Sequence, residues 1–253
     1  MLVPALLLPR VLTIAEQAGA VILQHYTQGT SVSTKADASP VTAADEAGEA
    51  VISAGLRELT PGIPVVAEEA VSRGEVPNVG EGAFWLVDPL DGTKEFISGN
   101  GEFTVNVGLI DHKRPVLGVV LAPARRLAWW GAAGQGASRR VDGEVSAIRV
   151  RARPQVGAVA VASRSHRDAD TDAWLAAEGI KDTISAGSSL KFCLVAEGKA
   201  DVYPRFGPTM EWDTAAGDAV LRAAGGRVET TSGMPFSYVK PGFRNTGFIA
   251  RGA

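Results

Sequence analysis

Apolar residues recur every three or four positions in two N-terminal stretches. The first runs from about Leu8 to Tyr26, in VLTIAEQAGAVILQHY, and the second starts near Thr42 and continues through AADEAGEAVISAGLREL. Repeats of this length are typical of helices with one buried face. Pro61 and Gly62 end the second helix. The segment between the two helices, GTSVSTKADASP, predicts an exposed loop because it is rich in Ser, Thr, Gly and Pro.

Shorter apolar runs then predict strands. IPVVAEEA and AFWLVDPL each indicate a buried strand that ends in carboxylates. Residues 102–140 predict several antiparallel strands, with turns near 111–114 and at the glycine-rich stretch 131–136. SAIRVRAR is expected to be the last strand of this half, and Pro154 marks a candidate seam.

Strand and helix patterns alternate after the seam. VGAVAVASRS precedes the helical DADTDAWLAAEG, DTISAG precedes SSLKFCLVAEG, and ADVYPRF precedes EWDTAAGDAVLRAAGG. This order is typical of a layered α/β unit. We therefore expect two halves: residues 1–153 with helices, an antiparallel sheet and most of a candidate site, and residues 154–253 with alternating strands and helices.

Composition narrows the class of protein. The chain has 253 residues, 45% hydrophobic and 21% charged, which suits a globular protein with a large core, in one domain or two intimate ones. The net charge is -3, and the 25 basic residues form no run of the kind that marks a nucleic-acid-binding arm. A nucleic-acid binder is therefore excluded.

One cysteine, Cys193, excludes an intramolecular disulfide and fits a reducing compartment. Its apolar surroundings, KFCLVAEG, favour a buried core thiol over a nucleophile. The N-terminal MLVPALLLPR lacks the basic region and cleavage site of a signal peptide, and no membrane span is expected. A cytoplasmic location follows as the expectation. Association with the cytoplasmic side of an inner membrane, and the choice between monomer and homodimer, stay open.

Acidic residues follow three apolar segments. They are Glu68 with Glu69, Asp88 with Asp91, and Asp213. Carboxylates that converge on one point repel one another unless cations are present. Magnesium prefers carboxylate, carbonyl and water oxygens. The pattern predicts a magnesium site.

The stretch DPLDGT has the residue types for such a site. Pro89 fixes its φ angle and turns the chain, which can bring Asp88 and Asp91 to one side together with the Leu90 carbonyl. Gly92 allows unusual dihedral angles and a close approach of a ligand.

Thr93 is expected to start a short helical turn whose free N–H groups suit a phosphate. Taken alone, this segment fits a solvated turn equally well, and Asp213 fits an ordinary helix cap.

Three motifs in this order, VVAEEA, WLVDPLDGTKEF and EWDTAAGDAVLRAAGG, resemble those of the inositol monophosphatase superfamily of metal-dependent phosphatases. The resemblance covers nearly the whole chain. KADASPVTAAD, SRSH and GSSLKFCLVAEGKADVYPRFGPTMEWDTAAG are most similar to its CysQ-type 3'(2'),5'-bisphosphate nucleotidases. One departure is AEEA where SEE is usual, and it leaves both carboxylates in place.

This resemblance implies a layered sandwich of mixed α+β and α/β character, ordered α-β-α-β-α. It also implies magnesium-dependent hydrolysis of 3'-phosphoadenosine 5'-phosphate to AMP and phosphate, with inhibition by lithium. Related substrates are 3'-phosphoadenylyl sulfate and, in some members, inositol phosphates. The implied role is to clear a nucleotide by-product of sulfate assimilation.

The resemblance also assigns roles to residues. Two or three Mg²⁺ ions would be held by Glu68, Asp88, the Leu90 carbonyl, Asp91 and Asp213. Asp45 and Thr93, with Glu68, would orient and activate the attacking water. The substrate would be contacted by Glu68, Leu90, Asp91, Gly92, Thr93, His166, Ser188, Lys191, Arg205 and Asp213.

Lys191 and Arg205 would supply positive charge for the second phosphate of a bisphosphate. Simpler readings stay open at this point: a solvated helix face for Lys191 and Asp45, a turn cap for Thr93, and a structural role for His166. The alternative functions are an inositol monophosphatase, a fructose-1,6-bisphosphatase, or a non-catalytic magnesium- or nucleotide-binding module. A binding module has no need of the water-activating pair, which argues against it.

Overall fold

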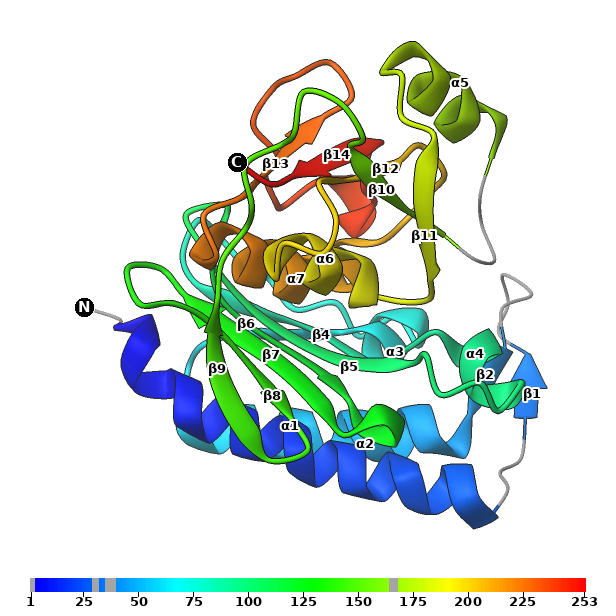
Figure 1. Ribbon diagram of the computed structural model, residues 1–253. Helices are drawn as coiled ribbons and strands as arrows, with labels where there is room; N and C mark the ends of the chain where they lie inside the picture. The colour runs from blue at the N-terminus through cyan, green and yellow to red at the C-terminus, as the bar shows by residue number, and fades with distance from the viewer. Residues whose placement is uncertain (1–2, 29–31, 35–39, 164–167) are drawn as a thin grey trace.

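The computed structural model describes residues 3–28, 32–34, 40–163 and 168–253, with only the backbone described for 32–34, 40 and 41. Two sheets dominate it (Figure 1). Seven strands form the first, in the order β3-β4-β5-β6-β7-β8-β9. Their bounds are β3 Val65–Ala67, β4 Phe84–Asp91, β5 Thr104–Asp111, β6 Arg114–Ala122, β7 Leu127–Ala132, β8 Gly136–Val141 and β9 Glu144–Ile148.

Helices α1 (Pro4–Gln28) and α2 (Ala43–Leu59) cover one face of this sheet (Figure 1). Their apolar stripes pack on the strands: Val11, Ile14 and Ile22 of α1 are buried in the same core as Trp85 and Val107. By length and composition alone α1 is long and apolar enough to cross a membrane, a test that buried core helices also pass, so the expectation of no membrane span stays a prediction. In the structure its apolar face lies against the sheet, as in a core helix.

Helices α6 (Leu190–Ala196) and α7 (Glu211–Ala223) lie on the other face of the first sheet and separate it from the second (Figure 1). The second sheet has the order β11-β10-β12-β14-β13. Its strands are β10 Val159–Ser163, β11 Asp182–Ala186, β12 Val202–Arg205, β13 Arg227–Thr230 and β14 Phe248–Arg251. Strand β10 runs parallel to β11 and β12, and β14 is antiparallel to β12 and β13.

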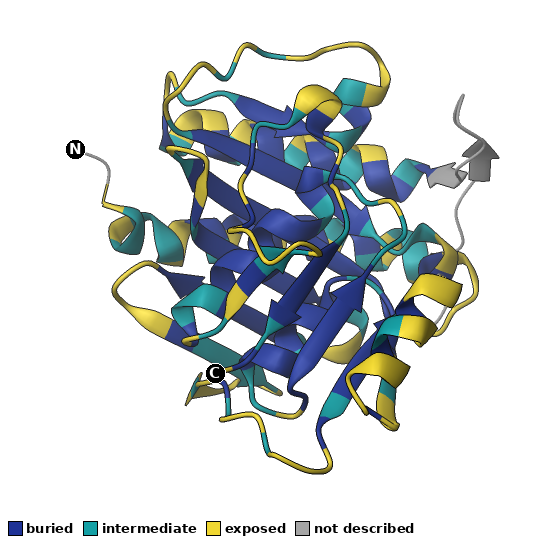
Figure 2. Cartoon of the chain, turned by 90° about the horizontal axis from the view of Figure 1, so that it is seen from above, coloured by how far each residue is buried: buried dark blue, intermediate teal, exposed yellow. Residues whose placement is uncertain are grey.

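Helix α5 (Ala169–Ala177) closes the outer face of the second sheet over a small core that includes Leu175, Val202 and Ile249. The layers are therefore α1/α2, sheet, α6/α7, sheet, α5, which confirms the α-β-α-β-α sandwich. Buried residues follow the strands of both sheets (Figure 2). The sheets fall on either side of Pro154, but one core joins them, and the division into two halves stays a prediction.

The remaining elements are short. They are the hairpin β1 (Val32–Thr34) with β2 (Pro40–Thr42), the helices α3 (Glu68–Ser72) and α4 (Thr93–Ile97), and the 3-10 turns Pro123–Arg125 and Pro241–Phe243. Two strand expectations need correction. The strand of IPVVAEEA stops at Ala67, and the two glutamates begin α3. In SAIRVRAR pairing stops at Ile148, because β9 is an edge strand whose partner β8 ends its register there.

A row of three glycines lets α7 approach the first sheet. Gly108 on β5 pairs with Gly118 on β6, which pairs with Gly131 on β7. A Cβ atom at Gly118 would lie 2.2 Å from the Ala216 carbonyl oxygen. At Gly108 and Gly131 it would lie 2.8 Å and 2.6 Å from the Cβ atoms of Ala215 and Ala223. Helix α7 and the first sheet are therefore in close contact along this row, with no side chain on the glycine positions to separate their backbones.

Gly118→Ala is expected to lower the free energy of unfolding by about 2–3 kcal/mol, because the added methyl overpacks this contact. Urea unfolding measures the loss. Gly82→Ala is the matched control: a Cβ there meets nothing within 4 Å and the residue is exposed. We expect a change within about 0.5 kcal/mol for the control. Equal stability of the two variants would show that the glycine row is not tightly packed.

Candidate active site

The predicted metal ligands line one cavity of about 280 Å³ between the two sheets. Strand β4 and helix α4 form one wall, and segments of the second half form the other. Its lining includes Glu68, Asp88, Leu90, Asp91, Gly92, Thr93, Ser188, Lys191, Arg205 and Asp213. Ten of the twelve predicted site residues therefore line this cavity. Asp45 lies behind it, next to Thr93, and His166 lies outside the described residues.

The end of β4 has the irregular geometry that its sequence predicts. Its pairing with β5 shifts register between Asp88 and Asp91, so Pro89 and Leu90 leave the ladder. The Leu90 N–H donates to Asp88 Oδ1 at 3.0 Å. Gly92 has φ 93°, in the left-handed region that favours glycine, and Thr93 begins helix α4. The expected helical turn at Thr93 is confirmed.

Asp45 lies at the first turn of α2 and forms a capping box with Thr42. Its Oδ2 accepts hydrogen bonds from the Thr42 N–H at 2.8 Å and the Thr42 hydroxyl at 2.6 Å. Its Oδ1 lies 3.4 Å from the Thr93 hydroxyl. Asp45 is only 2% exposed, which excludes a solvated helix face. The capping hydrogen bonds fix Asp45 Oδ2, and Asp45 Oδ1 is therefore directed toward the Thr93 hydroxyl.

Negative charge is crowded in this cavity. Burial, followed by the charges of Glu68, Asp91, Asp213 and Asp45, raises the pKa of Asp88 well above its usual range. Burial, followed by Asp91 and Glu68, does the same to the pKa of Asp213. Burial also raises the pKa of Asp91, although Lys191 opposes that shift. Such mutual repulsion is what a bound cation relieves.

The donor set fits a hard divalent cation, because carboxylate oxygens and the Leu90 carbonyl line one cavity. Within the described ranges, no three His, Cys, Asp or Glu side chains converge closely enough to form a ready-made metal centre. Protein donors hold an oxygen of each aspartate: Leu90 N–H for Asp88, the Ser189 hydroxyl for Asp91, and Met210 N–H for Asp213.

Ser189 and Asn106 were not predicted, yet they join the two walls of the cavity. The Ser189 hydroxyl lies 3.0 Å from Asp91 Oδ2 and 2.9 Å from the Asp213 carbonyl oxygen. Asn106 Nδ2 donates to Ser189 Oγ at 2.9 Å and lies 3.3 Å from Asp91 Oδ2. The signal in the sequence was a single polar residue, Asn106, inside the apolar strand TVNVGLI.

Ser188 lines the cavity, but its hydroxyl contacts the carbonyl oxygens of Asp91 and Glu102 at 2.8 and 2.7 Å. It also packs on Gly92, where a Cβ atom would lie 2.1 Å from Ser188 Oγ. Glu102 Oε2 accepts from the Gly187 N–H at 2.8 Å. These contacts hold the turn before α6 against the end of β4, so Ser188 supports the loop that carries Gly92.

Two cationic side chains face the carboxylates. Lys191 is 5% exposed, so the reading as a solvated face is wrong, and its ammonium donates to the Ser188 carbonyl oxygen. Burial lowers its pKa to about 8, while the charge of Asp91 opposes that shift. Arg205 donates to the carbonyl oxygens of Gly207 and Pro208 at 3.2 and 3.0 Å. Cys193, by contrast, is buried in the core, as expected.

Comparisons with known proteins agree with this fold and site. A family model described as the inositol monophosphatase family matches residues 8–248. A curated protein of Escherichia coli O6:H1, named 3'(2'),5'-bisphosphate nucleotidase CysQ, is 52% identical over 96% of this chain and 98% of its own. A Buchnera aphidicola protein of the same name is 40% identical over 96% and 93%.

Among solved structures, CysQ from Bacteroides thetaiotaomicron, described as a bacterial member of the inositol monophosphatase family, superimposes with a TM-score of 0.80 at 39% identity. The match covers 96% of each chain. Inositol monophosphatase from Anabaena matches with a TM-score of 0.78 at 28% identity, over 98% of this chain and 90% of its own. The chain belongs to the inositol monophosphatase family.

Proposed function

We propose that this protein is a magnesium-dependent 3'(2'),5'-bisphosphate nucleotidase that hydrolyses 3'-phosphoadenosine 5'-phosphate to AMP and phosphate. The observation that carries the proposal is the pairing, in one cavity, of the carboxylate set with Lys191 and Arg205. The carboxylates suit a metal-assisted phosphatase, and the two cations suit a second phosphate. The curated relatives named above bear this activity in their names.

Glu68, Asp88, Asp91, Asp213 and the Leu90 carbonyl would hold two or three Mg²⁺ ions. When bound, magnesium supplies charge neutralisation for the phosphate and lowers the pKa of a coordinated water. Side chains and backbone groups of the protein bind the substrate, orient the attacking water and accept its proton.

Thr93 and Asp45 orient the attacking water. The Thr93 hydroxyl accepts a hydrogen bond from the water and passes its own proton toward Asp45 Oδ1, 3.4 Å away. The water oxygen forms a bond to phosphorus as the bond from phosphorus to the ribose 3'-oxygen breaks. The 3'-oxygen keeps the electron pair and takes up a proton from solvent, and Asp45 returns its proton to solvent, which gives AMP and inorganic phosphate. Glu68 helps to position the water.

The 3'-phosphate, which the water attacks, is bound by the N–H groups of Gly92 and Thr93 at the start of α4. Lys191 and Arg205 bind the other phosphate, with Ser188 supporting the loop between the two sites. His166, which lies outside the described residues, is proposed to contact the nucleotide from the segment after β10. We place the protein in the cytoplasm, with the apolar face of α1 packed on the first sheet rather than inserted in an inner membrane.

Phosphate release from 3'-phosphoadenosine 5'-phosphate is expected to exceed that from inositol 1-phosphate, which has no second phosphate, by at least about a hundredfold in kcat/KM, and to exceed that from fructose 1,6-bisphosphate as well. Two charge-assisted contacts to the second phosphate contribute roughly 1.5–3 kcal/mol each, and 1.4 kcal/mol is a factor of ten. A phosphate-release assay with each substrate, with Mg²⁺, EDTA or added lithium, measures the preference.

Lys191→Met is the matched variant for this assay. It should weaken hydrolysis of the bisphosphate much more than hydrolysis of 3'-AMP, which lacks the second phosphate. A clear preference for inositol 1-phosphate or fructose 1,6-bisphosphate would replace the nucleotidase proposal with one of those activities. Substrate binding without turnover in Mg²⁺ would favour a binding module.

A further inference from the structure

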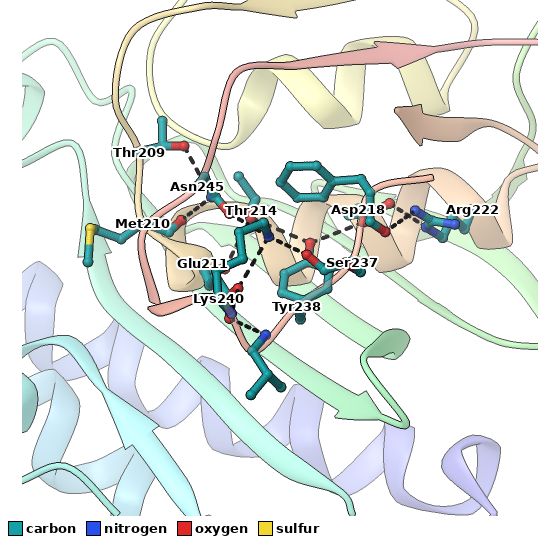
Figure 3. Close-up of polar contacts among 12 residues, drawn as sticks. Thr209, Met210, Glu211, Thr214, Asp218, Arg222, Ser237, Tyr238, Lys240 and Asn245 are labelled. Atoms are coloured by element: carbon teal, nitrogen blue, oxygen red, sulfur yellow. Dashed lines mark hydrogen bonds and ion pairs between the residues drawn. The ribbon is translucent and has the colours of Figure 1, made fainter. Parts of the chain in front are cut away.

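The segment 237–245 packs against the N-terminal end of α7, the helix that carries Asp213. Met210 forms an antiparallel bridge with Arg244, and the Asn245 N–H donates to the Thr209 carbonyl oxygen at 2.9 Å. Figure 3 shows the side chains of this contact, which form a network of polar contacts. Thr209 and Thr214 of this network also line the cavity. Residues 237–245 line no part of the cavity themselves.

Asn245 is the centre of this network. Its side-chain Nδ2 lies 2.7 Å from the Met210 carbonyl oxygen and 3.1 Å from the hydroxyls of Thr209 and Thr214 (Figure 3). The residue is 7% exposed. It therefore contacts the chain on both sides of Asp213 and cannot move without disturbing that turn.

Met210 connects Asn245 to the carboxylate. The Met210 N–H donates to Asp213 Oδ2 at 2.8 Å, and the Met210 carbonyl oxygen accepts from the Asp213 N–H at 3.2 Å. The same carbonyl oxygen is held by Asn245. A shift of Met210 would consequently release one oxygen of the Asp213 carboxylate and change its direction into the cavity.

Lys240 fixes the orientation of the Asn245 amide. Its ammonium lies 3.2 Å from Asn245 Oδ1 and 3.2 Å from Glu211 Oε1, and its side chain is 16% exposed. An ammonium only donates and a carbonyl only accepts, so the amide must turn its oxygen to Lys240 and its NH₂ to Met210. Glu211 is buried and also accepts from the Val239 and Lys240 N–H groups.

We propose that Asn245 and Lys240 are positioning residues that set the affinity of the Asp213 carboxylate for a divalent cation. They act through Met210 and touch neither substrate nor metal. The inference rests on the proposed metal site, but not on the identity of the substrate. Residues that orient a metal ligand typically change metal affinity by about 10–100-fold when they are replaced.

The test is Asn245→Asp, which keeps the shape of the side chain but replaces the NH₂ beside the Met210 carbonyl oxygen by a repelling oxygen. The readout is the Mg²⁺ concentration that gives half of the metal-induced rise in Tm, without substrate. We expect it to increase about tenfold relative to the natural protein. The Mg²⁺ concentration for half-maximal phosphate release should increase in parallel, whereas kcat at saturating Mg²⁺ should fall much less.

Asp218→Asn is the matched control on the same helix. Asp218 is buried, accepts from Arg222 Nε at 2.6 Å and from the Tyr238 hydroxyl at 3.1 Å, and does not line the cavity (Figure 3). It should lower Tm in EDTA without changing the Mg²⁺ requirement more than about twofold.

An unchanged Mg²⁺ requirement in Asn245→Asp, or an equal increase in Asp218→Asn, would overturn the proposal. If Asn245→Asp does not fold, Asn245→Ala is judged by the same criteria, since it removes the NH₂ beside the Met210 carbonyl oxygen and adds no charge. Because the Tm readout contains no nucleotide, a failure of the nucleotidase activity would leave the metal result intact and would be recognised separately.

Discussion

Asp91→Asn is expected to slow phosphate release about a thousandfold, a loss of about 4 kcal/mol in transition-state stabilisation, while the protein stays folded. Asp91 Oδ2 lies near Ser189, Asn106 and Thr104, at 3.0, 3.3 and 3.4 Å. The asparagine oxygen can accept from the same groups. The amide NH₂ then replaces the anionic oxygen proposed to hold the metal, and that replacement removes the function.

Thermal unfolding in EDTA checks that the fold survives. The lost attraction to Lys191 and the relieved repulsion with Asp88 and Asp213 oppose each other, so we expect Tm to stay within about 5 °C. Asp201→Asn is the control, because Asp201 is a buried aspartate that pairs with Arg151 outside the cavity. It should cost stability and keep turnover. Near-normal turnover in Asp91→Asn would overturn the metal assignment.

Thr93→Val and Asp45→Asn are each expected to lower kcat about a hundredfold. The double variant should be hardly slower than the worse single variant, because the two groups act on one water as a unit. Valine keeps the shape of threonine without its hydroxyl. Asparagine keeps an acceptor for Thr42, so the cap of α2 is largely retained. Steady-state kinetics at saturating Mg²⁺ measures all three variants.

Thr60→Val makes the same isosteric change at a buried threonine elsewhere in the core. Thr60 Oγ1 accepts from Trp85 Nε1 at 2.9 Å and lies outside the cavity. This control should lose stability and keep kcat. Strictly additive losses in the Thr93 and Asp45 variants would instead show two independent roles.

Elements with a strong period were predictable from the sequence. Helices α1, α2, α5, α6 and α7 and the strands of the first sheet all follow the expected order. Strands β13 and β14 were not assigned, because each has four residues and no long alternation. The Glu68–Ser72 helix was missed for a related reason: five residues carry too little pattern to mark where the strand before them stops.

The candidate site was predictable where the chemistry is local. The turn at the end of β4 is formed by neighbouring residues of one short segment, Asp88, Pro89, Asp91 and Gly92, so the local sequence is enough to predict it. Ser189 and Asn106 meet across 83 residues of sequence, and Asn245 meets Met210 across 35. Asn106 is a polar residue inside an apolar strand, but Ser189 and Asn245 are not unusual in their own segments. Only the packing of the second half on the first brings them to the carboxylates.

The glycine row has a consequence for how the cavity responds to physical stress. Strand β4 supplies Asp88 and Asp91 to one wall and α7 supplies Asp213 to the other. Next to this cavity, on β5, β6 and β7, the glycine row brings peptide atoms of the sheet against α7, with no long side chain between them that could change its rotamer. Hydrostatic pressure, which acts mainly on internal voids, should therefore compress the outer cores before it alters the width of the metal site.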